Sequence, residues 1–238
     1  MKNPKVLKMA VLAMLVALGV IISPILRVEG MCPMAHFINI TAAVLLGPYY
    51  ALLCAFLIGV IRMAVMGIPP LALTGAVFGA FLSGMLYRAS KGKLIFAVIG
   101  EVIGTGLIGA IISYPVMTIF WGRTDLTWLF YVPSFISGTL IGGSIAFIFI
   151  KQLIKAGLLA KYQAALGSKV YDTPNTVLSD SLGICFIGII AYLAVLVLVK
   201  NLLKLTGSAL TVYPLAAFLI FAVTGAIYYF VNMKKVKE

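Results

Sequence analysis

Residues 37–61, FINITAAVLLGPYYALLCAFLIGVI, form one apolar stretch that Gly47 and Pro48 divide near its middle. Proline inside a helix removes a backbone hydrogen bond and clashes with the preceding turn. The pair therefore predicts either two short helices or one broken helix, with halves that are each below the length needed to cross about 30 Å of hydrocarbon. The charge pattern described below favours two short helices. Further apolar segments cover residues 6–26, 71–86, 94–121, 128–150, 182–199 and 209–231. With two helices in residues 37–61, the chain has about eight segments.

The composition requires a membrane environment. Hydrophobic residues make up 63% of the 238 residues and charged residues 10%, against roughly 45–50% and 25% in soluble domains. A segment in lipid must satisfy its own backbone hydrogen bonds, which leaves helices or a closed barrel. The long apolar runs lack the period-two alternation of barrel strands. The sequence predicts an all-α integral membrane protein.

Lysine and arginine give the expected orientation, because cytoplasmic loops are enriched in both. If residues 37–61 form two helices, four basic clusters fall on one side. We expect this side, with the N-terminus and the C-terminus, to be cytoplasmic. The clusters are Lys2, Lys5 and Lys8; Arg88, Lys91 and Lys93; Lys151, Lys155, Lys161 and Lys169; and Lys234, Lys235 and Lys237. Such clusters between apolar runs, without interleaved aromatic residues, argue against nucleic-acid binding despite the formal charge of +12.

A polar stretch at residues 161–180 divides the chain. We expect a six-helix membrane core at residues 1–160, a polar cytoplasmic linker at 161–180 and a two-helix transmembrane hairpin at 181–238. The basic and apolar N-terminus is similar to a signal peptide, but its apolar run has spanning length and lacks a small-x-small cleavage site. We expect it to be a retained first helix.

Glu101 is the strongest candidate for a functional residue, because it lies inside an apolar helix in the run GEVIGTG at residues 100–106. A carboxylate at membrane depth needs a partner, a proton or a wet cavity. The surrounding small residues allow a neighbouring backbone or a ligand to approach closely. Glu101 and Thr105 are candidate substrate-binding residues, and a structural hydrogen bond to another helix is an equal alternative.

His36 and Asn39 are candidate substrate-binding residues at the outer end of the second segment. Their spacing of three places both on one helical face. Imidazole and amide groups can bond to an uncharged heteroaromatic ring or a hydroxyl. An interfacial helix cap is the alternative. One histidine cannot form a histidine-rich metal site.

Aromatic residues mark the outer ends of the fifth and sixth segments. Tyr114 and Trp121, near Trp128 and Tyr131, are candidates for stacking on a bound ring. An aromatic belt at the membrane interface is the favoured alternative. For Arg62, the favoured interpretation is that it extends to the interface from the end of the third segment.

Motifs for catalysis are missing from the sequence. It contains no GxxxxGK[ST] phosphate loop, no HExxH or GxSxG motif and no carboxylate cluster suited to metal chemistry. Cys32, Cys54 and Cys185 have no ligand-type spacing. We expect neither an enzyme nor a cofactor.

Several motifs, in order, resemble the ThiW family over about residues 5–155. They are HFIN at 36–39 with AVLLGP at 43–48, AF at 55–56 through Arg62, FGAF at 78–81 through Tyr87 and Arg88, and GEVIGTG at 100–106 with YPV at 114–116. ThiW proteins are substrate-binding S components of energy-coupling factor (ECF) vitamin transporters. The resemblance implies import of a thiamin precursor, with hydroxyethylthiazole as the expected substrate. It also implies a coupling subunit and two ATPases on separate chains in the cell membrane of a prokaryote.

The resemblance also implies roles for particular segments. Small residues on the first helix of S components face the coupling subunit, which corresponds here to Ala10, Ala13 and Ala17. The pocket would open outward under loops such as residues 27–35. One departure is LALTG at residues 71–75, where a Leu-Ala-Phe-Pro-Gly stretch is expected, so the loop bordering the pocket differs.

Two alternatives remain open from the residues. The chain could be a self-contained secondary transporter in which Glu101 carries a proton and the hairpin completes the bundle. It could also be a membrane scaffold that transports nothing.

Overall fold

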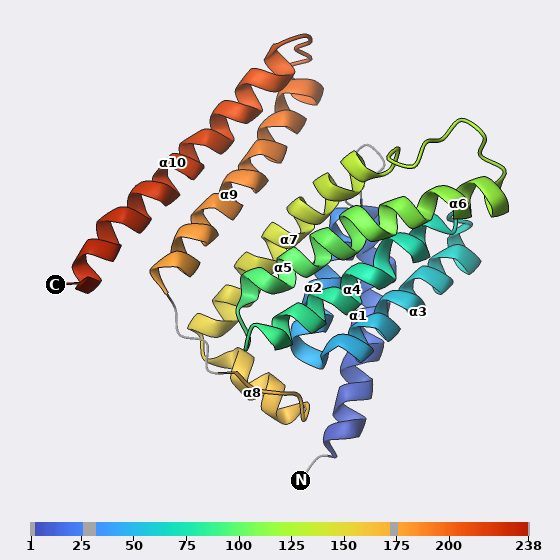
Figure 1. Cartoon of the computed structure of the whole chain (residues 1–238), viewed down its shortest axis with the longest axis horizontal. Coiled ribbons are helices and arrows are strands. Elements are labelled where there is room, and N and C mark those ends of the chain that lie inside the picture. Colours follow the sequence, from blue (N-terminus) through green and yellow to red (C-terminus); the bar gives the residue numbers. More distant parts are fainter. Residues whose placement is uncertain (1–2, 26–31, 172–175, 238) are drawn as a thin grey trace.

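The computed structural model describes residues 3–25, 32–171 and 176–237, and the regular elements in these ranges are all helices (Figure 1). Seven helices among them are long and apolar enough to cross a membrane. The chain is therefore an all-helical, multi-pass membrane protein. In order, the helices are α1 (Pro4–Ile25), α2 (Pro33–Leu46), α3 (Pro48–Met66), α4 (Leu71–Ala89), α5 (Leu94–Glu101), η1 (Val102–Gly109), α6 (Ala110–Trp121), α7 (Val132–Lys155), α8 (Leu158–Ala165), α9 (Val177–Val197), η2 (Leu198–Leu202) and α10 (Ala209–Lys237).

Gly47 separates α2 from α3, which confirms two helices in this stretch. The prediction that both are short is wrong for α3, which continues to Met66 and is long enough to cross a membrane. Its φ of 92° lies in a region that favours glycine. Pro48 then begins α3, where its missing N–H removes no helical hydrogen bond. A Cβ at position 47 would overlap with the guanidinium of Arg88. The break thus lies at the end of the bundle that carries Arg88.

Helix α2 is the central element of the bundle. Eleven of its fourteen residues are buried, and it packs against α1, α3, α4, α5, α7 and α8. Fourteen residues span about 21 Å, less than the roughly 30 Å hydrocarbon core. Its Leu46 end meets the Arg88 end of α4, and its other end is at Pro33. This is where the cavity described below lies.

Helices α5, η1 and α6 form one continuous apolar helix from Leu94 to Trp121. Its middle part, η1, is a π-helix, a rare form that is frequent at functional sites. A Cβ at Gly100 would lie 2.5 Å from the Leu82 carbonyl oxygen, and one at Gly104 would lie 2.5 Å from that of Phe78. Glycines therefore let the α5–η1 backbone touch α4, as the sequence predicts for a neighbouring backbone.

Helices α9 and α10 form a hairpin beside α7 (Figure 1). Lys151 on α7 forms an ion pair with Asp180 on α9, with Nζ 2.9 Å from Oδ1. The Phe147 and Phe186 rings pack with centroids 4.6 Å apart. Helix α10 packs against α9 and η2. The hairpin is joined to the other helices mainly through α9.

The predicted linker interval, residues 161–180, is partly helical. It contains the end of α8 and the start of α9. Gln163 on α8 is buried, and its Nε2 donates to the Val44 carbonyl oxygen at 2.9 Å. Helix α8 thus packs onto the end of α2.

Candidate functional site

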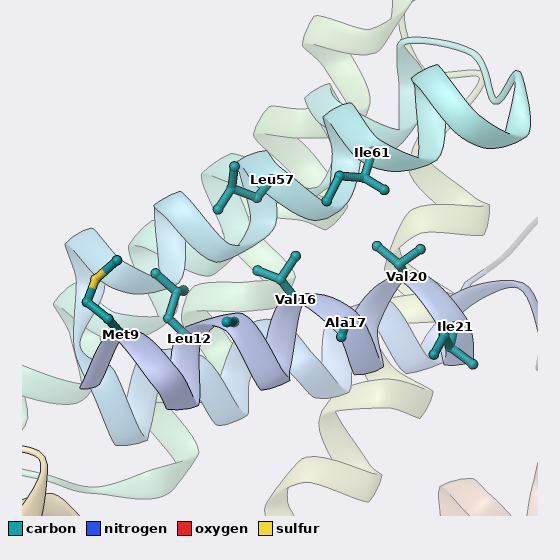
Figure 2. A pocket seen from close by; sticks show the side chains of 9 residues that line it. Met9, Leu12, Val16, Ala17, Val20, Ile21, Leu57 and Ile61 are labelled. Carbon is teal, nitrogen blue, oxygen red and sulfur yellow. The ribbon is translucent and has the colours of Figure 1, made fainter. Parts of the chain in front are cut away.

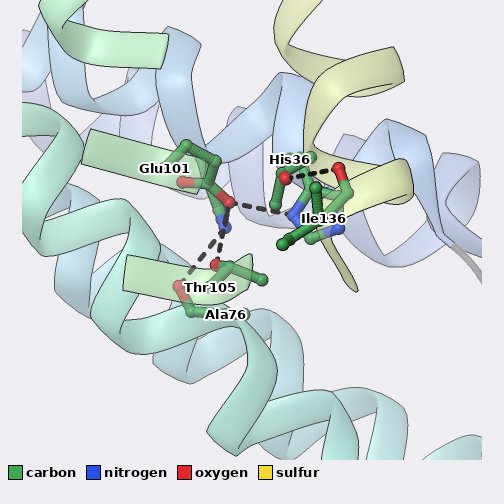
Figure 3. Close-up of polar contacts among 7 residues, drawn as sticks. His36, Ala76, Glu101, Thr105 and Ile136 are labelled. Carbon is green, nitrogen blue, oxygen red and sulfur yellow. Dashed lines mark hydrogen bonds and ion pairs between the residues drawn. The ribbon is translucent and has the colours of Figure 1, made fainter. Parts of the chain in front are cut away.

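Glu101 is the centre of a buried polar network between α2 and the α5–η1 helix (Figure 3). One carboxylate oxygen, Oε1, lies 2.9 Å from His36 Nδ1 and accepts from Asn39 Nδ2 at 2.9 Å and from Thr105 Oγ1 at 3.1 Å. Glu101 is fully buried, and Asn39 and Thr105 are almost fully buried. The structure therefore brings together four of the six predicted substrate-binding residues.

Helical spacing explains the geometry of the network. His36 and Asn39 are three residues apart on α2, and Thr105 lies four residues after Glu101. Both spacings place the side chains on one helical face. The second Asn39 N–H donates to the Ala76 carbonyl oxygen on α4 at 3.3 Å. The network thus connects three neighbouring helices.

Two glycines make room for the network. A Cβ at Gly79 on α4 would overlap with Thr105 Oγ1 and lie 2.8 Å from Glu101 Oε2. A Cβ at Gly142 on α7 would overlap with the Pro33 carbonyl oxygen and lie 2.8 Å from the Cβ of His36. Small side chains on α4 and α7 are therefore required for Glu101 and His36 to lie where they do.

Glu101 Oε2 is buried and has no hydrogen-bond partner among the described residues. All the donors of the network converge instead on Oε1. Leaving a buried acceptor unpaired is costly, so this arrangement is kept at a price in stability. The contact between His36 Nδ1 and Glu101 Oε1 holds the imidazole ring in a fixed orientation.

A cavity of about 100 Å³ lies next to this network, between α2, α3, α4 and α7. His36 is part of its wall, and since Nδ1 is bound to Glu101, Nε2 is the ring nitrogen left for a ligand. Most of the lining is apolar, with few polar groups, as is usual for small-molecule sites. The lining residues are Cys32, Ala35, His36, Arg62, Ile68, Pro69, Leu71, Ala72, Gly75, Ala76, Ser134 and Phe135.

Arg62 differs from the interpretation favoured by the sequence. It is only 5% exposed and lines the cavity, so it does not extend to the membrane interface. Its Nη2 donates to Cys32 Sγ at 3.7 Å, a weak contact. Arg62, Ser134 and Phe135 are cavity residues that sequence reasoning missed. For Arg62 the available signal was a cation at the end of an apolar helix, which does not reveal the side it faces.

The predicted loops border the cavity in part. Leu71, Ala72 and Gly75, from the stretch that departs from the expected family pattern, are lining residues. Cys32 and Ala35 come from the predicted capping loop at residues 27–35. Residues 27–31 of that loop lie outside the described residues.

Tyr114 and Trp121 lie elsewhere. Tyr114 packs on Trp128 with ring centroids 4.5 Å apart, in a cluster with Met117, Leu126 and Tyr131. Trp121 is 49% exposed at the end of α6. Neither lines the cavity, and their role as substrate-binding residues stays a prediction.

A second hollow is an apolar groove of about 480 Å³ between α1 and α3 (Figure 2). Ala13 and Ala17 line it, and Ala10 is exposed one turn before Ala13. The groove is lined by Met9, Leu12, Ala13, Val16, Ala17, Val20, Ile21, Leu57 and Ile61. Small residues in such a groove allow another helix to approach closely.

The described residues contain no group of three or more His, Cys, Asp or Glu side chains that could hold a metal ion. The site's chemistry is therefore described by hydrogen bonding, charge and apolar contact.

Comparison with known families matches residues 9–156 to the family described as thiamine-precursor transporter protein (ThiW). The match covers more than half of the chain and includes both the cavity and the Glu101 network. It ends just after α7, before α8 and the α9–α10 hairpin. No curated protein and no solved structure matches the chain. The chain belongs to the ThiW family of thiamine-precursor transporters.

Proposed function

We propose that this chain is the substrate-binding S component of an ECF transporter that imports hydroxyethylthiazole. The observation that carries the proposal is the cavity between α2, α3, α4 and α7, with His36 in its wall and the buried Glu101 behind it. Glu101 holds the imidazole, and Nε2 bonds to a polar atom of the ligand. The apolar lining covers the faces of the ring.

The size of the cavity favours a one-ring substrate. Drug-sized ligands occupy roughly 300–1,000 Å³, whereas a cavity of about 150 Å³ can bind benzene. A cavity of about 100 Å³ suits a single five-membered ring after a small adjustment. Thiamin, with two rings, is too large without rearrangement.

The proposal divides the chain into a six-helix substrate-binding core at residues 1–160, a linker at 161–180 and a two-helix hairpin at 181–238. The family match supports this division, because it ends at residue 156.

Both termini are proposed to face the cytoplasm of a prokaryotic cell. Lys8, whose Nζ lies 5.0 Å above the Tyr50 ring, and Arg88, beside Gly47, support a shared basic end. Cytoplasmic ends are enriched in such residues.

The energy for transport is proposed to come from two ATPases and a membrane coupling subunit on separate chains. The α1–α3 groove is the proposed contact for the coupling subunit, with Ala10, Ala13 and Ala17 exposed on α1. Substituting Ala13 by Leu would fill the groove and is expected to abolish uptake while ligand binding persists.

Calorimetry on the purified chain tests the substrate. Hydroxyethylthiazole is expected to bind, thiamin to bind far more weakly, and His36→Ala to lose hydroxyethylthiazole binding. Tyr213→Phe, on the exposed surface of α10, is the matched control and should bind normally. Failure of the wild-type chain to bind either compound would overturn the proposed substrate.

Uptake assays distinguish the S component from a self-contained secondary transporter. The chain alone in proteoliposomes is expected to show no accumulation, even with a proton gradient. Co-purification from native membranes should recover an ATPase pair. Gradient-driven uptake by the chain alone would contradict the proposal.

A further inference from the structure

Arg62 presents to the cavity a positive charge that has no counter-ion among the described residues. The side chain is 5% exposed and lies in the cavity wall. Its Nε is buried with no hydrogen-bond partner, and its Nη2 has the weak contact to Cys32 Sγ. No described carboxylate forms an ion pair with it. The guanidinium is therefore buried without a counter-ion among the described residues.

This situation is unusual in physical terms. A guanidinium keeps its charge at physiological pH, and burying an unpaired charge in an apolar bundle is strongly unfavourable. Glu101 does not pair with it: the ion pair that Glu101 forms is with His36, and Glu101 is not part of the cavity wall. The planar fork of Arg matches two oxygens of a carboxylate or phosphate.

We propose that Arg62 binds an oxyanion group, a phosphate or carboxylate, on the one-ring substrate. This proposal rests on the proposed substrate cavity and specifies the ligand's charge. The ring lies against the apolar lining, its polar edge meets His36, and its charged substituent meets Arg62. Within the thiazole class of the proposed function, Arg62 thereby favours a phosphorylated or carboxylated derivative, and the neutral alcohol binds the same cavity more weakly.

Two other anions are alternative counter-ions for the Arg62 guanidinium. One is Glu29 of this chain, which lies outside the described residues. The other is a phospholipid headgroup, because the chain is a membrane protein. Each has its own arm in the experiment.

The experiment uses the full-length chain in dodecyl maltoside, which carries no phosphate. Calorimetry compares hydroxyethylthiazole, its phosphate monoester and the corresponding thiazole carboxylate. The charged compounds are expected to bind about 10- to 100-fold more tightly than the alcohol, as for hydrogen bonds to a charged group. Arg62→Met should abolish this preference, and a thermal unfolding transition like that of the wild-type chain shows that the variant is folded.

Arg62→Lys is the second variant, because it keeps the charge and loses the fork. It should retain part of the preference. Alcohol binding without a preference for the charged compounds, or a preference that survives in Arg62→Met, overturns the role of Arg62 and leaves the proposed function standing. Absence of binding for all three compounds overturns both.

The remaining arms address the other anions. Adding phosphatidylglycerol should leave the preference unchanged, and its loss would assign Arg62 to a lipid headgroup. Glu29→Gln should also leave it unchanged. A preference that emerges only in Glu29→Gln would assign Arg62 to Glu29. Either result overturns the proposal.

Discussion

The helices around the Glu101 network and the α9–α10 hairpin are both apolar, but they differ in what surrounds them. About half of the membrane-length windows in α7 and in the Leu94–Trp121 helix is buried, at 56% and 50%, against 22% for Val177–Leu202 and 11% for Ala209–Met233. About half of each window in the first set is therefore covered by the rest of the chain, whereas most of the surface of the hairpin is not. Apolarity alone does not distinguish the two situations.

The two regions also differ in their buried polar groups. In the first region, the side chains of His36, Asn39 and Thr105 all bond to the Glu101 carboxylate. Within the hairpin, Ser181 Oγ donates to the Gly225 carbonyl oxygen at 2.8 Å, a simple contact between two helices. Polar residues inside membrane segments are costly and commonly mark functional sites, which is why we propose a role in ligand binding for the Glu101 network. Substitutions in the two regions should therefore affect ligand binding differently.

Glu101→Ala should have the largest effect. It leaves the donors of His36, Asn39 and Thr105 without their shared acceptor, in a site with no solvent exposure at Glu101. Breaking such a buried network costs about 3–5 kcal/mol. Thermal unfolding in detergent should show a large loss of stability, and calorimetry should show no ligand binding.

Glu101→Gln separates shape from charge. The amide oxygen can still accept hydrogen bonds, so this variant should remain folded. Asp125→Asn is the control, since Asp125 is exposed in the segment between α6 and α7. It should change neither the thermal stability nor the ligand affinity. Normal binding by Glu101→Ala would show that the network does not support the cavity.

Gly79→Ala and Gly225→Ala apply one small change to both regions. At Gly79 the new Cβ would overlap with Thr105 Oγ1, and at Gly225 it would lie 2.8 Å from Cys185 Sγ. Overpacking of this kind costs about 1–3 kcal/mol. Both variants should melt at lower temperature, but only Gly79→Ala should weaken ligand binding. Equal effects on binding would contradict the division of function between the regions.

The sequence predicted the helices well, because each depends on local information. Apolar run length gave the membrane segments, and the backbone restrictions of Gly47 and Pro48 gave the break between α2 and α3. It did not predict the π-helical form of η1. That stretch packs tightly against α4 through Gly104 and Gly109, and close packing of this kind is a tertiary property.

The candidate site was predicted in part. His36, Asn39, Glu101 and Thr105 could be selected because polar groups inside apolar helices require partners. That they are one another's partners depends on contact between helices more than sixty residues apart, which spacing along one helix does not reveal. For Arg62, the sequence gave its position near a helix end but not that it faces inward.

Among the stability effects proposed here for the two regions, that of Asp180→Asn should be the smallest and the most restricted. It removes the carboxylate that lies 2.9 Å from Lys151 Nζ and 3.5 Å from Lys155 Nζ. Lys151 keeps its bond to the Ser179 carbonyl oxygen, and Asp180 is partly exposed, so we expect a loss of about 1–2 kcal/mol, below the cost of breaking a fully buried pair. Because this ion pair joins α9 to α7 far from the cavity lining, thermal stability should fall while the ligand affinity stays unchanged. Lys155→Gln, which removes the longer and more exposed contact, is the matched control and should change stability less. Weaker ligand binding in Asp180→Asn would show that the hairpin supports the cavity through α7, and would remove the distinction between the two regions.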